Sequence, residues 1–356
     1  MNSKLSYIPQ LDALRAIAVI LVVNFHWLGG FWTFGGGSGV TLFFVLSGFL
    51  ITRILLYEKY QHPDHKLKVI GNFIARRTLR IFPIYYLFIF FFFLIGDPYM
   101  RQHIAWYISY CSNIHFFNVG MLDTTMYAHT WSLATEEQFY LIWPWLLLFI
   151  NRKHELKLIG AYILTGIVFR IILEVVLHKY SITLLPSSFD AFGIGALLAY
   201  ITLNTENSST AEKLLGFLKK HLSALTIFPF ILSMVLFHLR LPYPYAGLAN
   251  IFFQTFFSIF SMAFIYHAVI GFKGSSSLFF NNKAVLYVGK ISYGIYLYHK
   301  VIPWAYSYAA KKLHYSFEET GTWQYFLYLA TVILVAHLSW KLVETPVIRL
   351  KKRFVY

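Results

Sequence analysis

Long apolar runs alternate with short polar and basic segments along the whole chain. A membrane helix needs about 20 predominantly apolar residues, and ten of the runs reach or approach that length. The pattern therefore predicts ten membrane helices, at approximately 11–30, 39–57, 81–96, 138–150, 158–178, 189–203, 222–239, 247–270, 285–306 and 323–342. The fourth and sixth are short, so we expect them to extend into polar flanks or to follow a tilted, partly re-entrant path. The aromatic but more polar segment 104–119 is expected to lie in the membrane interface or to fold over a site.

The composition agrees with this pattern. Of the 356 residues, 58% are hydrophobic and only 13% are charged, whereas a soluble domain carries about 25% charged residues. The predicted fold class is therefore an all-α, polytopic membrane helical bundle. We expect a single integral-membrane domain over residues 1–356, with no appended soluble domain. The one cysteine, Cys111, excludes an internal disulfide and any multi-cysteine metal site.

The basic residues indicate how the bundle is oriented. The formal net charge is +15, but Lys and Arg lie in short loops between apolar runs, which argues against nucleic-acid binding. With the N-terminus inside, 22 of the 30 Lys and Arg residues fall in cytoplasmic segments and 5 in outer loops. Positive charge is enriched on the cytoplasmic side, so both termini are expected to be cytoplasmic. The first apolar run is too long for a cleavable signal peptide and contains Arg15.

Two ionisable side chains, Arg15 and His26, lie inside the first predicted helix. Such residues are costly in a membrane segment and by default mark a function. Eleven steps of roughly 100° end about 20° past three full turns, so both side chains share one face, about 16 Å apart. An anchor for an anionic group and a proton-transfer group would then line one groove. The alternative is an arginine that extends to the interface and a histidine buried against a backbone carbonyl.

A basic cluster precedes the third predicted helix. Arg76, Arg77 and Arg80 are three or four residues apart, so one helical turn gathers them on a common face. Guanidinium groups suit a phosphate group better than scattered lysines do. The alternative role is a positively charged anchor on the cytoplasmic side.

Polar residues also precede the fourth predicted helix. Glu136 and Glu137 point about 100° apart on a helix, so at most one of them faces a given site squarely. A glutamate at the mouth of a membrane bundle can orient and polarise a histidine. Trp131, Ser132 and Tyr140 carry hydrogen-bond donors that could stabilise an oxyanion. The alternative is a solvated outer loop that becomes helical only afterwards.

Other polar residues have structural alternatives. Asp190 opens the sixth predicted helix, where an acid also favours the helix dipole. His299 is a second membrane histidine, and its predicted helix runs outward through the membrane as the helix of His26 does. Arg170 and Glu174 are four apart and are expected to form a structural ion pair. No spacing requires a metal ion, and we expect none.

The second predicted helix begins with a glycine-rich run over residues 34–39 and contains Ser47 and Gly48. The run lacks the Gly-Lys-Ser/Thr ending of a phosphate-binding loop, which excludes that type of nucleotide site. Ser47 and Gly48 are interpreted as small residues for helix packing, in preference to a nucleophilic serine.

Six runs together resemble the integral-membrane acyltransferase family 3, the bacterial O-acyltransferases that act on polysaccharides and other exported glycoconjugates. The resemblance is collinear over nearly the whole chain, although Thr41 and Gly294 depart from the common pattern. The runs are Arg15 with ten residues before His26, Phe43-Phe-Val-Leu-Ser-Gly-Phe-Leu-Ile51, Arg76-Arg-Thr-Leu-Arg-Ile-Phe-Pro83, Thr130-Trp-Ser-Leu-Ala-Thr-Glu136, Ser292-Tyr-Gly-Ile-Tyr-Leu-Tyr-His299 and Val343-Glu-Thr-Pro346.

The resemblance implies an O-acyltransferase of the bacterial cytoplasmic (inner) membrane, with no permanently bound cofactor. The family's functional positions match His26, Glu136, Arg15, Arg76, Arg77 and Arg80. Acyl-CoA, expected to be acetyl-CoA, would enter from the cytoplasm with its phosphates on the arginines. His26, oriented by Glu136, would then take a proton from a hydroxyl of an envelope or exported polysaccharide or glycolipid. The hydroxyl attacks the thioester directly, or His26 first carries the acyl group.

Two other classes of function remain open from the sequence. A transporter or flippase for a sugar-linked lipid would also use charges at the membrane midplane, but its usual inverted repeats are not apparent. A structural partner in an envelope assembly would have no activity of its own. The sequence leaves open the acceptor, the acyl group and the oligomeric state, including a homo-oligomer.

Overall fold

The computed structural model describes residues 6–28, 37–120, 125–239, 245–314 and 321–354. Lys4 and Arg240, which entered the charge distribution, and residues 34–36 of the glycine-rich run lie outside the described residues. Across the described ranges the regular structure is helical, with no β-strand.

The longer helices cross the molecule side by side. They are α1 (Gln10–Leu28), α2 (Ser38–Gln61), α3 (Lys66–Leu94), α6 (Thr130–Phe149), α7 (Glu155–Arg170), α8 (Phe189–Leu203), α10 (Leu222–His238), α11 (Tyr245–Ile270) and α16 (Thr322–Ser339). The shorter helices are α4 (Pro98–Ile108), α5 (Ser112–Val119), η1 (Arg152–His154), η2 (Ile171–Val176), η3 (Leu185–Ser188), α9 (Ser209–Lys220), α12 (Ser276–Phe280), α13 (Lys283–Lys290), α14 (Ser292–Tyr298), α15 (Val301–Lys312), η4 (Trp340–Glu344), α17 (Thr345–Arg349) and η5 (Leu350–Arg353).

The fold is an all-α, polytopic membrane bundle, as predicted. Among the described residues, seven helical segments are long and apolar enough to cross a membrane. The number rises to eight if α9 and α10, which meet at a bend of 70°, form one span. The count of ten therefore stays a prediction.

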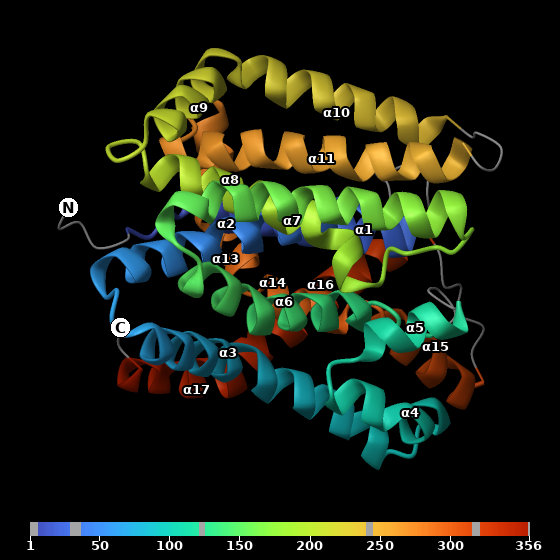
Figure 1. Ribbon diagram of the computed structural model, residues 1–356. Coiled ribbons are helices and arrows are strands. Elements are labelled where there is room, and N and C mark those ends of the chain that lie inside the picture. Colours follow the sequence, from blue (N-terminus) through green and yellow to red (C-terminus); the bar gives the residue numbers. More distant parts are fainter. Residues whose placement is uncertain (1–5, 29–36, 121–124, 240–244, 315–320, 355–356) are drawn as a thin grey trace.

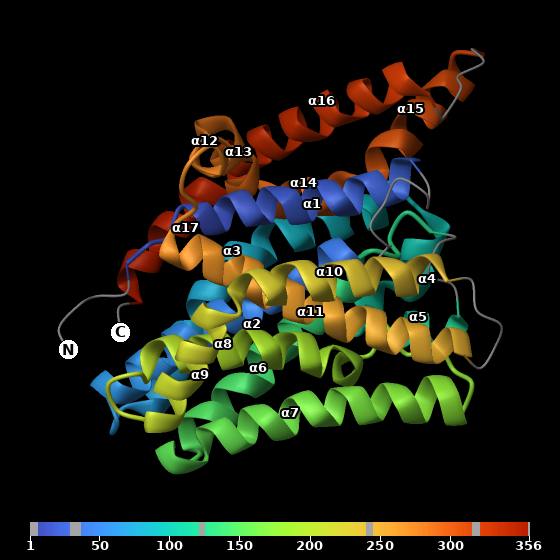
Figure 2. The same cartoon turned by 90° about the horizontal axis from the view of Figure 1, so that it is seen from above.

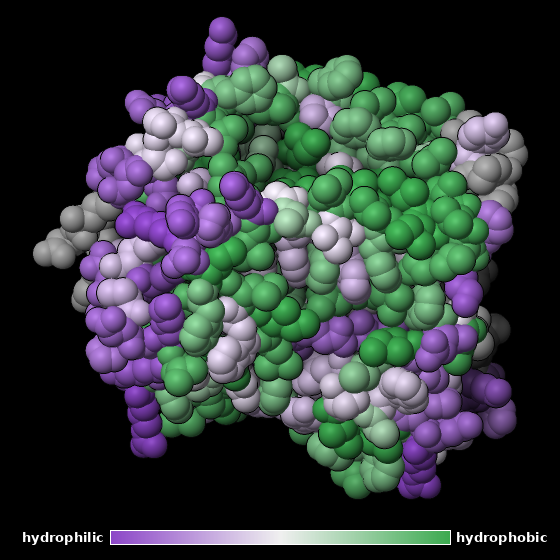
Figure 3. Space-filling view, in the orientation of Figure 1, coloured by the Kyte–Doolittle hydropathy of each residue, from purple (hydrophilic) through white to green (hydrophobic). Residues whose placement is uncertain are grey.

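The start of α1 and the helix α17 lie at the same end of the bundle in both ribbon views (Figures 1 and 2). Figure 3 shows hydrophilic side chains gathered at that end and a broad hydrophobic surface over the middle of the same face. Large apolar side chains are exposed there and elsewhere, among them Leu164, Phe228 and Leu334. Such a surface is expected of a protein whose outer face contacts lipid.

Small residues bring α2 and α8 into close contact. A Cβ atom added to Gly48 would collide with the carbonyl oxygen of Phe192, and one added to Gly195 would collide with that of Val45. The packing role predicted for Gly48 is therefore confirmed, and it is of the small-residue kind common between membrane helices.

Two helices begin earlier than their apolar runs. The helix α3 begins at Lys66, so the arginine cluster is helical and extends the apolar span predicted from residue 81. The helix α6 begins at Thr130, so Ser132 and Glu136 are also helical. Hydropathy identifies only the apolar part of a helix, so the polar first turns of α3 and α6 were not predicted.

The single helix predicted over 285–306 is wrong, because α13, α14 and α15 follow one another there as separate short helices. Non-helical backbone is tolerated at membrane depth where protein surrounds it or a cavity adjoins it. His299 and Lys300 lie at the second interruption, between α14 and α15.

The predicted Arg170–Glu174 ion pair is also wrong. Arg170 pairs with Asp190, and Glu174 accepts hydrogen bonds from Ser181 and Asn250. The cause is local: the π-helix η2 begins at residue 171, and its wider turn moves residue 174 off the face that carries residue 170.

The segment 104–119 forms parts of α4 and α5, which lie at the opposite end of the bundle from α17 (Figure 1). Helix α5 packs beside α6, where Ser112 Oγ donates to the carbonyl oxygen of Thr130 at 3.2 Å. Its position relative to the membrane interface stays a prediction.

Candidate functional site

Three cavities follow one another through the bundle and share residues where they meet. We name them the arginine cavity, the middle cavity and the histidine cavity, with volumes of about 1610, 750 and 1300 Å³. The arginine and middle cavities share Arg15, Arg77 and Arg80, whereas the middle and histidine cavities share Val40 and Tyr296. Shared lining residues therefore connect the arginine cavity to the middle cavity, and the middle cavity to the histidine cavity.

The arginine cavity collects cations from several elements. Its charged lining comprises Arg15, Arg53, Arg76, Arg77, Arg80, Lys351 and Glu58. Arg15 forms a salt bridge with Asp12, and Asp12 also accepts a hydrogen bond from the hydroxyl of Tyr7. Burial, together with that bond, raises the pKa of Tyr7 to about 12. Because the charged lining holds many more cations than carboxylates, the cavity has a surplus of positive charge, as a site for a polyanion requires.

The three clustered arginines do not have the same environment. Arg77 and Arg80 line both the arginine and the middle cavities, whereas Arg76 lines only the arginine cavity. Arg76 also donates to the carbonyl oxygen of Phe354 at 3.1 Å, which ties α3 to the C-terminal segment. Sequence reasoning missed Arg53, which is a single basic residue, and Lys351, which lies in the basic run 349–353 and was interpreted only as a topology signal.

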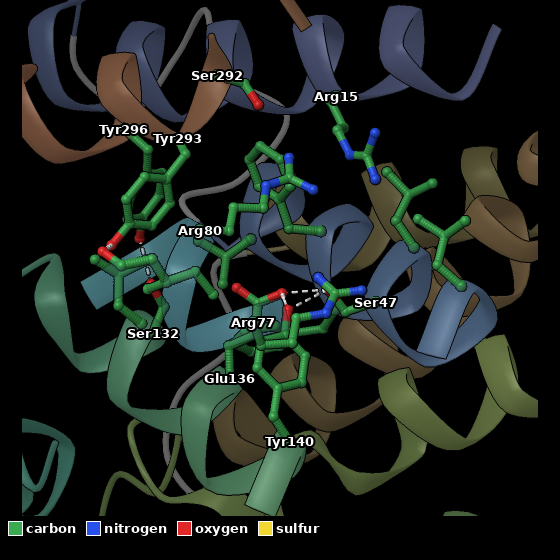
Figure 4. Close-up of a pocket in the computed structure, with 17 residues that line it drawn as sticks. Arg15, Ser47, Arg77, Arg80, Ser132, Glu136, Tyr140, Ser292, Tyr293 and Tyr296 are labelled. Carbon is green, nitrogen blue, oxygen red and sulfur yellow. Dashed lines mark hydrogen bonds between the residues drawn. The ribbon is translucent and has the colours of Figure 1, made fainter. Parts of the chain in front are cut away.

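The middle cavity contains Glu136, whose carboxylate accepts hydrogen bonds from the hydroxyls of Ser47 and Tyr140 (Figure 4). The guanidinium of Arg77 lies over the Tyr140 ring, 5.0 Å from its centroid. Glu137 is buried and lines neither this cavity nor the two others. Only one of the two adjacent glutamates faces the site, as their angular separation predicts.

Two hydroxyl groups lie where the middle cavity approaches the histidine cavity. The Tyr296 hydroxyl and Ser132 Oγ are 2.5 Å apart, and each lies 3.1 Å from the carbonyl oxygen of His129 (Figure 4). Ser132 was a candidate from the sequence, but Tyr296 was not singled out. Its position three residues before His299, on a shared helical face, was the available signal.

The histidine cavity is lined by His26, His129 and Trp131, with Asn250 and Gln254 from α11. His299 lies against His26 at the edge of this cavity: its Nε2 is 3.1 Å from His26 Nδ1, and the ring centroids are 4.9 Å apart. The sequence predicted that His26 and His299 lie in helices that both run outward through the membrane. The structure brings their side chains into contact. In the described part of the chain, no three His, Cys, Asp or Glu side chains are arranged to hold a metal ion.

Glu136 and His26 line different cavities, and the predicted role of Glu136 in orienting His26 stays a prediction. Glu136 lies seven residues after His129 on α6, which is two helical turns or about 10 Å along the axis. It therefore lines the middle cavity, whereas His26 lines the histidine cavity. The His299 ring lies against His26, with its Nε2 at 3.1 Å from His26 Nδ1.

Asp190 belongs to a structural cluster. Its carboxylate pairs with Arg170, and the Arg170 guanidinium also donates to Gln254 Oε1 at 2.5 Å and Thr255 Oγ1 at 3.0 Å. Arg170 and Asp190 are both fully buried. The pair joins α7, α8 and α11, and Gln254 connects it to the wall of the histidine cavity.

A family model described as an acyltransferase domain, of acyltransferase family 3, matches residues 8–341. The chain therefore belongs to this acyltransferase family. It is similar to the peptidoglycan O-acetyltransferase OatA of Listeria monocytogenes, with 32% identity over 364 residues, covering 96% of this chain and 56% of that protein. It is also similar to the O-acetyltransferase OatA of Staphylococcus aureus, with 29% identity over 370 residues, covering 96% and 57%. The chain thus spans a little over half the length of these relatives, and no solved structure matches it.

Proposed function

We propose that this chain transfers an acetyl group from cytoplasmic acetyl-CoA to a hydroxyl group of a cell-envelope glycan on the outer side of the membrane. The observation that carries the proposal is the series of cavities that leads from a surplus of arginines to His26. The relatives support acetyl as the group and a glycan as the acceptor, because one of them is named for peptidoglycan O-acetylation.

The arginine cavity suits the nucleotide end of the donor. Coenzyme A carries a pyrophosphate and a further phosphate, and guanidinium groups bind such groups through paired hydrogen bonds. Arg76, Arg77 and Arg80 would hold these phosphates, with Arg15 at the entrance to the middle cavity. The extended pantetheine arm is comparable in length to the distance of about 16 Å between Arg15 and His26 along α1.

The acetyl group would be transferred where the middle and histidine cavities meet. The acceptor hydroxyl gives its proton to His26, and its oxygen forms a bond with the thioester carbonyl carbon. The tetrahedral oxyanion is stabilised by a hydroxyl donor, for which Tyr296 is best placed because it lines both cavities. The carbon–sulfur bond then breaks, and the thiolate of coenzyme A takes the proton from His26. The products are an acetyl ester and free coenzyme A.

Glu136 has a different role in this scheme from the one that the sequence suggested. Its carboxylate fixes the hydroxyls of Ser47 and Tyr140 in the wall of the middle cavity, beside Arg77. We assign it to shaping the path of the thioester and not to orienting His26. A hydrophobic path with fixed polar groups excludes water, which would otherwise hydrolyse the donor.

The test is acetyl transfer by the purified protein, with radiolabelled acetyl-CoA and soluble peptidoglycan oligosaccharides as acceptor. His26→Ala is expected to lower kcat by about 10²- to 10⁴-fold, the usual contribution of a general base. His337→Ala is the matched control, because His337 lies on α16, contacts Tyr287 and lines none of the three cavities. Equal activity of wild type and His26→Ala would remove His26 from the mechanism. Absence of acetyl-CoA binding to the wild type would overturn the proposal and favour transport of a sugar-linked lipid.

A further inference from the structure

We propose that His299 is the positioning residue for His26: it accepts a hydrogen bond from Nδ1 of His26 and so presents Nε2 as the proton-accepting nitrogen. This inference rests on the proposed function, in which His26 is the base. It gives to a neutral histidine the orienting role that the sequence assigned to Glu136.

The hydrogen bonds determine which ring nitrogens carry hydrogen. His299 Nδ1 lies 2.6 Å from the carbonyl oxygen of Tyr296. A carbonyl oxygen can only accept, so Nδ1 of His299 carries the hydrogen and its Nε2 carries the lone pair. His26 Nδ1 lies 3.1 Å from that lone pair and 2.9 Å from the carbonyl oxygen of Val22. Both neighbours are acceptors, so His26 carries its hydrogen on Nδ1 and its lone pair on Nε2.

The interruption between α14 and α15 places His299 against His26. A helix end leaves carbonyl groups without partners, and side chains from other helices supply the donors here. Trp27 Nε1 donates to the carbonyl oxygen of His299 at 3.1 Å, and His129 Nε2 donates to that of Leu297 at 3.0 Å. Because Trp27 is adjacent to His26, α1 holds His299 both through its backbone and through its ring.

This arrangement suits proton transfer. When His26 takes a proton on Nε2, the ring becomes a cation, and its Nδ1–H bonds to His299 and Val22 strengthen. The buried aspartate of a catalytic triad orients its histidine in the same way. Here the partner is neutral, which avoids the cost of burying an anion. His299 is fully buried and lines none of the three cavities, so it acts through His26 and not on the substrate.

Other polar groups also face this pair. His129 approaches His299 with ring centroids 4.9 Å apart, and the Tyr296 ring lies 5.6 Å from that of His299. Lys300 follows His299 in the chain, and the His299 ring is fully buried among these groups. A buried ring without an anionic partner favours the neutral state, which is the state that can accept from His26.

The test compares two substitutions of similar polarity. His299→Gln places an amide group near the position of Nε2 and keeps an acceptor for His26, whereas His299→Asn places its amide near Nδ1 and does not reach His26. We expect His299→Asn to lower kcat by about 10- to 100-fold with the KM of acetyl-CoA unchanged, and His299→Gln to stay within about threefold of wild type. Thermal unfolding in detergent should be similar for both variants. Equal kcat for the two variants would overturn the inference.

A double-mutant cycle separates this inference from the proposed function. If His299 acts through His26, His299→Asn has no further effect in a His26→Ala background. Multiplicative losses would show an independent role and overturn the inference alone. Full activity of His26→Ala would instead overturn the proposed function. His337→Asn, at a membrane histidine outside the cavities, is the control and is expected to behave as wild type.

Discussion

The buried Arg170 and the cavity-lining pair Arg77 and Arg80 differ in what surrounds them. Arg170 is fully buried, and its hydrogen bonds go to Asp190, Gln254 and Thr255. Arg77 and Arg80 are only partly buried and line two cavities. From the sequence, Arg170 was expected to form a structural ion pair, whereas Arg77 and Arg80 were expected to bind a phosphate group. The comparison shows that the deciding feature is an adjoining cavity, because only there is the charge available to a ligand.

The largest expected effect comes from breaking the Arg170 cluster. Arg170→Met leaves the buried Asp190 carboxylate without its cation, and we expect a loss of about 3–5 kcal/mol of stability. Thermal unfolding in detergent measures this loss of stability. Combining Arg170→Met with Asp190→Asn should restore much of the loss, since no buried anion then remains. A normal melting temperature for Arg170→Met, combined with a raised KM for acetyl-CoA, would contradict the structural assignment.

A smaller and different effect is expected from Arg80. Arg80→Gln removes one charged partner of a phosphate and should raise the KM of acetyl-CoA by about 10- to 100-fold. The KM of the acceptor and the melting temperature should not change. Arg101→Gln is the control, because Arg101 lies on α4, donates to the carbonyl oxygen of Phe93 and lines none of the cavities. If the KM of the acceptor rises instead, the arginine cavity is not the donor site.

The smallest effect is expected at the rim of the arginine cavity. Lys351 lines this cavity but is partly exposed, so salt screens its charge. Lys351→Gln should raise the KM of acetyl-CoA only a few-fold at low salt, and the difference should vanish at high salt. Lys352→Gln, at the neighbouring exposed position, is the matched control. A loss that persists at high salt would indicate a direct hydrogen bond to the donor.

The sequence predicted the parts of this molecule that depend on one helix at a time. The fold class follows from apolar runs, and the face shared by Arg15 and His26 follows from helical geometry alone. Accordingly, Arg15 lines the arginine cavity and His26 the histidine cavity. The angular argument also selected one of the two adjacent glutamates, and Glu136 is the one that lines a cavity.

Features that depend on how helices lie relative to one another were not predictable. The contact expected between Glu136 and His26 depends on the relative depth of α6 and α1, which no single-helix pattern contains. The interruption after α14 was missed although Pro303 cannot donate to the carbonyl oxygen of His299, four residues earlier, and Trp27 from α1 donates to that oxygen instead. The Arg170–Glu174 pair failed because a π-helix changes the local register, and its sequence resembles an ordinary helix.

The meeting of the middle and histidine cavities at Val40 and Tyr296 has a consequence for how the cell uses its acetyl donor. In the part of the chain that the structure describes, only these two side chains line both the middle and the histidine cavities. In an enzyme of the proposed kind, the two-carbon group would change carriers at that point. The nucleotide stays with the arginines, on the side from which it came. The cell would then modify its exterior without exporting its activated carrier.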